Sequence, residues 1–186
     1  MVERGFKARA SRLAVEIRSE FGLKVTDVFD PYEYFSAYGV PVLELSSLEV
    51  SDMQIAHQGI RDKFSGALIS TGSGVMVLDN DWHPRNRRRS TTTHEAAHHI
   101  LEHAFATAIS VEERKCGLAR EQEDEADILA GELLIPFEAA KRHATAGWSD
   151  WQVADLYEVS IEFARWRMGA SGARKYAASV KKYRSR

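Results

Sequence analysis

The pattern of apolar positions changes along the chain from helical to strand-like and back to helical. Between residues 7 and 21, apolar side chains recur every three or four positions, which is typical of one face of a helix. Asp30, which is followed by proline, predicts the start of a second helix. A short strand is predicted at 40–45, and two apolar runs at 66–70 and 75–78 flank the sequence Thr-Gly-Ser-Gly. Glycines between two such runs indicate the turn of a β-hairpin.

From Pro84 onward the pattern is helical. Prolines and serines divide this half of the chain into predicted helices at 84–105, 121–135, 137–145, 150–157 and 161–168. An order of helices, then strands, then helices is typical of the α+β class. We therefore predict an α+β fold with a small, mostly antiparallel sheet and a predominantly helical second half.

The composition is that of an ordinary globular protein. The chain has 186 residues, of which 44% are hydrophobic and 28% charged, and this supplies enough apolar material for one core. We expect a single domain over residues 1–168, followed by a basic C-terminal tail over 169–186 that is solvated and partly frayed. The net charge of −2 argues against a protein that coats nucleic acid, and we expect weak or no direct nucleic-acid binding.

The compartment follows from what the sequence lacks. Cys116 is the single cysteine, so no intramolecular disulfide can form. The N-terminal residues contain no apolar run long enough for a signal peptide, and no segment approaches the roughly 20 apolar residues that a membrane-spanning helix needs. We expect a cytoplasmic protein without membrane association.

Residues 94–98 read His-Glu-Ala-Ala-His, the HExxH pattern. On a helix, His94 and His98 lie on one face with Cβ atoms about 5–6 Å apart, so both imidazoles can reach one zinc ion. Glu95 lies next to that face, where it can act on a water at the zinc. The alternative is a helix that begins at Thr92, in which Glu95 would bind the backbone as part of a capping box.

A third ligand is available downstream. A cluster of acidic residues begins the helix predicted at 121–135, and either Glu123 or Glu125 could reach the zinc. Spacing alone does not decide between them, although only Glu123 has an aspartate, Asp127, one turn further on. Acidic residues are also favoured in a first helical turn by the helix dipole, so the cluster has a structural explanation as well.

Two stretches of the chain resemble the ImmA/IrrE family of metallopeptidases. The first is the run Arg87–Thr93 directly before the HEAAH sequence, and the second is Glu123–Pro136, which reads EDEADILAGELLIP. The similarity extends over about residues 10–168. Ser90, Ala97 and Leu129 depart from residues that are common in the family, but none of these departures removes a ligand.

The resemblance implies a zincin-like active-site helix with zinc held by His94, His98 and Glu123. Glu95 would be the catalytic base. Glu123 and Asp127 match the Glu-x-x-x-Asp arrangement of zincin peptidases, in which the aspartate holds a ligand histidine by its second ring nitrogen.

The helical wheel favours the same choice of carboxylate. Glu123 lies one turn before Ala126 on the side that the apolar residues mark as buried, whereas Glu125 is offset from Ala126 by about 100° toward solvent. We therefore expect Glu123 to face the metal and Glu125 to face water.

The implied function is that of a zinc-dependent endopeptidase. A zinc-activated water, with Glu95 as general base, would hydrolyse a peptide bond in a transcriptional regulator of helix-turn-helix type, in a bacterial or phage setting. His143 and Tyr157 are candidates for stabilising the oxyanion. The rival interpretation is a partner-binding or toxin–antitoxin module with a structural or vestigial zinc site. A third interpretation, direct DNA binding, rests on the two short helices over 150–168, which resemble a helix-turn-helix followed by a basic tail. The sequence does not indicate an oligomeric state.

Three further expectations concern side chains around the site and the core. His103 could form a hydrogen bond near the site, but it is expected at the surface. Trp148, Trp151 and Trp166 are expected in the core. A substrate strand is expected to pair along the sheet edge at 75–78.

Overall fold

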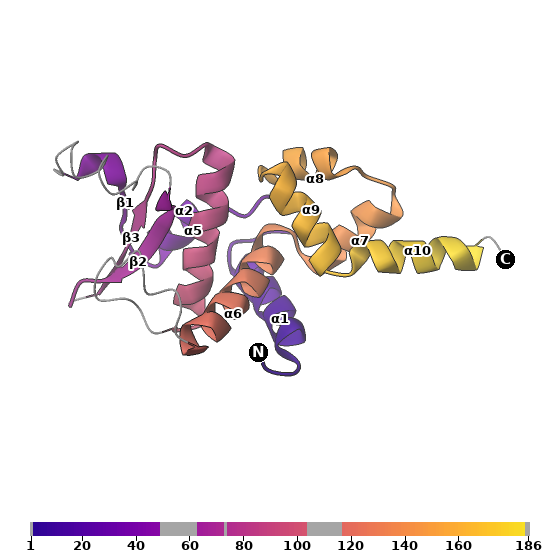
Figure 1. The fold of residues 1–186 in the computed structure, drawn as a ribbon, viewed down its shortest axis with the longest axis horizontal. Helices are drawn as coiled ribbons and strands as arrows, with labels where there is room; N and C mark the ends of the chain where they lie inside the picture. Colours follow the sequence, from indigo (N-terminus) through magenta and orange to yellow (C-terminus); the bar gives the residue numbers. More distant parts are fainter. Residues whose placement is uncertain (1, 49–62, 73, 104–116, 185–186) are drawn as a thin grey trace. The chain divides into compact units, whose positions relative to one another are not determined.

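The computed structural model describes residues 2–48, 63–72, 74–103 and 117–184, and these form an α+β fold (Figure 1). They divide into two compact units. The sheet unit comprises residues 1–2 and 30–127, and the helical unit comprises residues 3–29 and 128–186. Because the helical unit combines the beginning and the end of the chain, the two units are not successive segments. The predicted single domain over residues 1–168 stays a prediction.

The sheet unit contains a mixed three-stranded sheet in the order β1-β3-β2. Its strands are β1 (Val42–Glu44), β2 (Gly66–Ser70) and β3 (Val75–Asp79). β2 and β3 form the predicted antiparallel hairpin, while β1 pairs with β3 in parallel. β3 is therefore the central strand. The expectation that a substrate strand pairs along 75–78 is wrong, because both sides of β3 are already occupied by strands.

Helix α5 (Arg85–Ile100) packs against β2, and α2 (Pro31–Ala37) packs against α5 (Figure 1). Gly66 makes the approach to β2 possible. A Cβ atom at this position would meet the Thr91 side chain at 2.8 Å and the Leu78 carbonyl oxygen at 3.2 Å. A side chain at position 66 would therefore require the Thr91 side chain or the neighbouring strand to shift.

The basic run at the start of α5 is neutralised by carboxylates of the same unit. Arg88 lies 2.6 Å from the fully buried side chain of Asp79 and 2.9 Å from Glu44, and Arg89 lies 3.8 Å from Asp30. α5 begins at Arg85 after Pro84, so Thr92 is an interior residue and is buried. The alternative that Thr92 caps this helix is therefore excluded.

The helical unit is built from helices of its two sequence segments, 3–29 and 128–186. They are α1 (Phe6–Glu20), the end of α6 (Gly117–Leu134), α7 (Phe137–Thr145), α8 (Asp150–Tyr157), α9 (Ile161–Ala170) and α10 (Ala173–Arg184). Two buried arginines bind carbonyl oxygens at the end of α6, since Arg18 donates to Leu133 and Arg167 donates to Ile135. These bonds satisfy carbonyls that a helix end leaves without a partner. Arg167 also forms a buried ion pair with Glu132 at 2.7 Å.

The tryptophans of the helical unit do not form its core. The exposed fractions of Trp148, Trp151 and Trp166 are 37%, 62% and 43%, so that expectation is wrong. The core is filled by aliphatic side chains such as those of Val153 and Ala164, both fully buried, together with Tyr157 and Met168. They allow the short helices to pack closely and leave the indole rings outside.

The basic region after Met168 is also more ordered than expected. It contains the end of α9 and all of α10, and α10 packs against α7 with Ala173 fully buried. The frayed tail is thus corrected to a helix for residues 173–184. Among the described residues, no helix is long and apolar enough to cross a membrane.

Candidate metal centre

Three side chains in the sheet unit converge on one point. His94 and His98 come from α5 and Glu123 comes from α6, and their ligand atoms all lie within 4.8 Å of one another. The two Nε2 atoms are 3.0 Å apart. Glu123 Oε2 lies 3.3 Å from His94 Nε2, and Glu123 Oε1 lies 3.4 Å from His98 Nε2. The structure thus brings together the three residues that the sequence proposed as ligands.

These distances fit a small divalent cation. Zinc–nitrogen and zinc–oxygen bonds of about 2.0–2.1 Å at tetrahedral angles separate two ligand atoms by roughly 3.3 Å. The observed separations of 3.0, 3.3 and 3.4 Å match this value. Two imidazoles and one carboxylate leave a fourth tetrahedral position open, as in catalytic rather than structural sites.

The electrostatics of the cluster also favour positive charge at its centre. Burial lowers the pKa of His94, but hydrogen bonds to Asp127 and Glu123 outweigh burial and raise this pKa to about 10. The hydrogen bonds from His94 and His98 hold the pKa of Glu123 well below its usual range. The carboxylates around the two imidazoles therefore favour a cation at this point.

Each of the two histidines also contacts a second side chain through Nδ1, the ring nitrogen that does not face the other candidate ligands. Asp127 Oδ1 lies 3.0 Å from His94 Nδ1. His103 Nδ1 lies 2.9 Å from His98 Nδ1, and His103 Nε2 in turn lies 3.3 Å from Glu125 Oε2. Such contacts behind a ligand fix the tautomer and the orientation of its ring.

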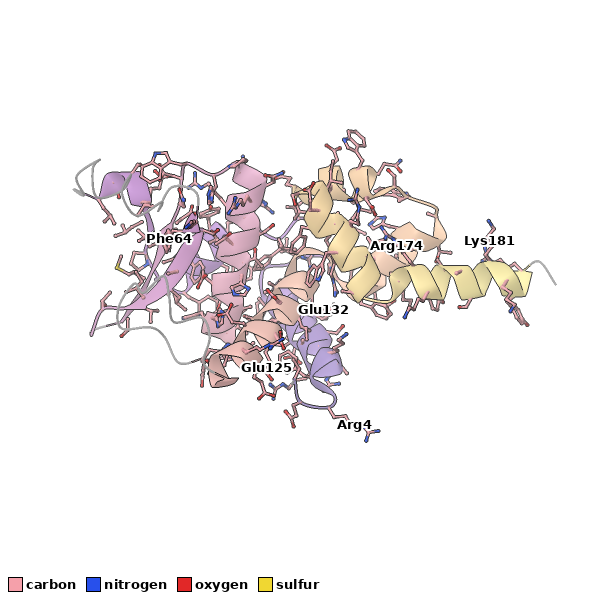
Figure 2. All side chains as sticks on the ribbon, viewed as in Figure 1. Arg4, Phe64, Glu125, Glu132, Arg174 and Lys181 are labelled. Carbon is pink, nitrogen blue, oxygen red and sulfur yellow. The ribbon has the colours of Figure 1, made fainter. Side chains whose placement is uncertain are left out.

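Two expectations about this surrounding shell are wrong. His103 is buried, with 7% of its surface exposed, and is not a surface residue. Glu125 (labelled in Figure 2) does not face solvent, because its side chain is only 15% exposed beside His103, whereas that of Glu123 is 38% exposed. The helical wheel contains only one helix, so it carried no information about His103, which packs beside Glu125.

Glu95 points toward the sheet. It is buried, and its Oε2 accepts a hydrogen bond of 3.0 Å from the backbone N–H of Leu68 in β2. Val77, the partner of Leu68 in the hairpin, donates its own N–H to Pro41 on the opposite side of β3. The N–H of Leu68 therefore points to the outer edge of β2, where α5 lies.

Other residues named from the sequence lie elsewhere. His143 Nε2 and Tyr157 Oη are 3.0 Å apart and buried in the helical unit. Burial lowers the pKa of His143 and raises that of Tyr157 to about 12, so both are neutral near neutral pH. Their suggested role at the oxyanion stays a prediction. Cys116 lies outside the described residues.

Comparison with known families identifies this arrangement. The family model of the peptidase M78 group, described as the IrrE N-terminal-like domain, matches residues 36–168. The chain belongs to this family. The matched residues include His94, Glu95, His98 and Glu123, and the ImmA/IrrE resemblance is confirmed. A comparison with curated proteins gives no match.

Membership of the IrrE-like family supports a metallopeptidase-type function. The cluster of His94, His98 and Glu123 is a candidate metal site of the kind that such a function needs. Sequence reasoning missed the contact of His103 with both His98 and Glu125, and the bond from the backbone of Leu68 to Glu95.

Proposed function

We propose that this IrrE-like protein is a zinc-dependent endopeptidase in which His94, His98 and Glu123 hold the metal and Glu95 is the general base. The observation that carries the proposal is the convergence of the three ligand atoms at separations of 3.0–3.4 Å. Zinc suits a site of two imidazoles and one carboxylate with tetrahedral spacing. When bound, zinc lowers the pKa of water to about 7 and polarises the carbonyl group of the scissile bond.

Glu95 moves the proton. Its Oε2 is fixed by Leu68, and Oε1 is then the atom that takes a proton from the attacking water. As the carbon–nitrogen bond breaks, Oε1 gives this proton to the leaving amine, so Glu95 ends the cycle as a carboxylate. Burial of Glu95 limits competition from bulk water, and the bond from Leu68 keeps the carboxylate from rotating.

The substrate strand is proposed to pair with β2. On the outer edge of the hairpin the N–H of Leu68 already donates to Glu95. Gly66 and Ser70 share the alternation of Leu68 and direct their backbone groups to the same edge. Extended peptides commonly bind by adding a strand to such an edge. Because Glu95 binds to Leu68 on this edge, a peptide that pairs there lies next to the proposed base.

The substrate is proposed to be a transcriptional regulator of helix-turn-helix type, and the reaction to take place in the cytoplasm. The support for this is the resemblance to the ImmA/IrrE family. The competing function is a partner-binding or toxin–antitoxin module whose metal site is structural or vestigial. The two functions differ in whether a bound regulator is cut.

The test is a pair of measurements on one matched variant. Glu95→Gln keeps the size of the side chain and the bond to Leu68 but cannot accept the proton. We expect it to bind zinc as the wild type does and to lose about 10²–10⁴-fold in cleavage of a candidate regulator. Elemental analysis and the appearance of fragments report the two properties. A wild-type protein that binds the regulator with zinc present and never cuts it would support the binding module instead.

A further inference from the structure

We propose that His103 and Glu125 act together as positioning residues for His98, setting the tautomer in which its Nε2 is free to bind the metal. This inference rests on the proposed role of His98 as a ligand. It assigns a function to a buried contact that the fold alone does not require. His103 meets His98 at its Nδ1, the nitrogen that faces away from the metal position, and Glu125 contacts His103 rather than His98.

The argument begins with donors and acceptors. A neutral imidazole carries one N–H, and its other nitrogen accepts. If His98 binds a metal through Nε2, its proton is on Nδ1, and that N–H must donate to His103 Nδ1 at 2.9 Å. His103 then carries its own proton on Nε2 and donates it to Glu125 Oε2 at 3.3 Å. Every polar atom in this chain of contacts has a partner of the correct kind.

The opposite arrangement is incompatible with metal binding. With a proton on Nδ1 of His103, His98 Nδ1 would have to accept, and the His98 proton would sit on Nε2. Glu125 disfavours this state because its carboxylate oxygen has no proton to give and needs the N–H of His103. The tautomer preference therefore passes from Glu125 through His103 to His98.

The end of α5 is what brings His103 to this place. Glu102 adopts a left-handed conformation with φ of 53°. The N–H of Glu102 binds the carbonyl of His99, and the N–H of His103 binds the carbonyl of His98. This pair of bonds is the Schellman motif, in which the second residue after the cap packs against the third helical residue from the end. Here those two residues are His103 and His98.

Burial makes the contact persistent. His103 is 7% exposed and the side chain of Glu125 is 15% exposed, so water competes weakly for either hydrogen bond. The His98 and His103 rings meet edge to face with centroids 5.0 Å apart. A simple packing role would need the shape of the His103 ring, whereas the proposed role needs its Nδ1 acceptor.

The experiment compares zinc affinity among variants of the full chain, measured by competition with a chelator. His103→Phe keeps an aromatic ring and removes both nitrogens, and we expect it to weaken zinc binding about 10–100-fold. His103→Asn offers an amide oxygen near the position of Nδ1 and should recover most of that loss. Asp124→Asn is the matched control, because it removes an exposed negative charge next to Glu125 and should change the affinity less than twofold.

A second readout does not depend on zinc. Nitrogen-15 NMR of the metal-free protein distinguishes the two tautomers of each imidazole. We expect His98 with its proton on Nδ1 and His103 with its proton on Nε2, and we expect His98 to lose this preference in His103→Phe. This readout separates the inference from the proposed function, because it decides about the positioning pair even in a chain that binds no zinc.

Two results would overturn the inference. One is a folded His103→Phe protein with wild-type zinc affinity and an unchanged His98 tautomer, which would reduce the contact to packing. The other applies if His103→Phe does not fold. In that case Glu125→Leu, which retains His103, must weaken zinc binding and release the tautomer, and wild-type values for both would reject the proposal.

Discussion

The two histidines of α5 are supported in different ways. His94 is held directly by a carboxylate, Asp127, whose side chain is 59% exposed. His98 is held by a buried imidazole, which is held in turn by a nearly buried carboxylate. Water can replace an exposed acceptor when it is lost, but it cannot easily replace a buried one. The two supports should therefore differ in how much the site depends on them.

The difference also concerns where the supports come from in the sequence. Asp127 is one helical turn from Glu123, so a single helix delivers a ligand and the support of another ligand. The contacts that hold His98 require His103, which follows α5, to pack against Glu125 of α6. The first arrangement is local and tolerant, whereas the second depends on tertiary structure.

The largest effect expected is the loss of a ligand itself. Glu123→Ala should abolish stoichiometric zinc binding, because two imidazoles alone hold the ion weakly and neither support can substitute for a ligand. Elemental analysis after gel filtration measures the zinc content. Glu125→Ala is the matched control two residues away, and it should weaken zinc binding without abolishing it. Zinc retained by the first variant and lost by the second would exchange the roles of the two carboxylates.

An intermediate effect is expected at the exposed support. Asp127→Asn preserves the shape and leaves an amide oxygen that can still accept from His94, and water can reach the site as well. We expect zinc affinity to fall about 2–10-fold, below the range expected for disruption of a buried support. Chelator competition under identical conditions gives both values. If Asp127→Asn weakens zinc as much as His103→Phe does, exposure does not govern the strength of the two supports.

Much of this site could be predicted from sequence because it is periodic. The spacing of His94 and His98 and the step from Glu123 to Asp127 are both one helical turn, and a turn has the same geometry in every protein. The β-hairpin at 66–79 was predicted on the same local grounds, from its glycines and its flanking apolar runs. The strand at 40–45 was also predicted and is β1, but its parallel pairing with β3 was not, because pairing between strands distant in sequence leaves no local pattern.

The remaining features depend on chain reversal and packing. His103 was expected at the surface because nothing in the residues after Ile100 marks a left-handed turn, and the usual glycine is absent. The exposed tryptophans were expected in the core, but the apolar character of a side chain does not decide which face of a short helix is covered. The burial of Glu125 was also not predicted, because Glu125 and His103 pack against each other and their contact depends on the turn after α5.

The smallest effect is expected at Glu102, the residue that turns the chain at the end of α5. A side chain at φ of 53° costs free energy that glycine does not pay, so Glu102→Gly should stabilise the folded protein by about 0.5 kcal/mol after the entropy of glycine in the unfolded chain is included. Zinc affinity should stay unchanged, because the Schellman bonds remain and His103 keeps its place.

The matched variant is Glu102→Val, whose branched side chain strongly disfavours this conformation. It should destabilise the helix end and weaken zinc binding together, because displacement of His103 removes the support of His98. Urea unfolding and chelator competition measure the two quantities. If Glu102→Val lowers stability and leaves zinc affinity untouched, the turn at Glu102 is not what holds His103 against His98.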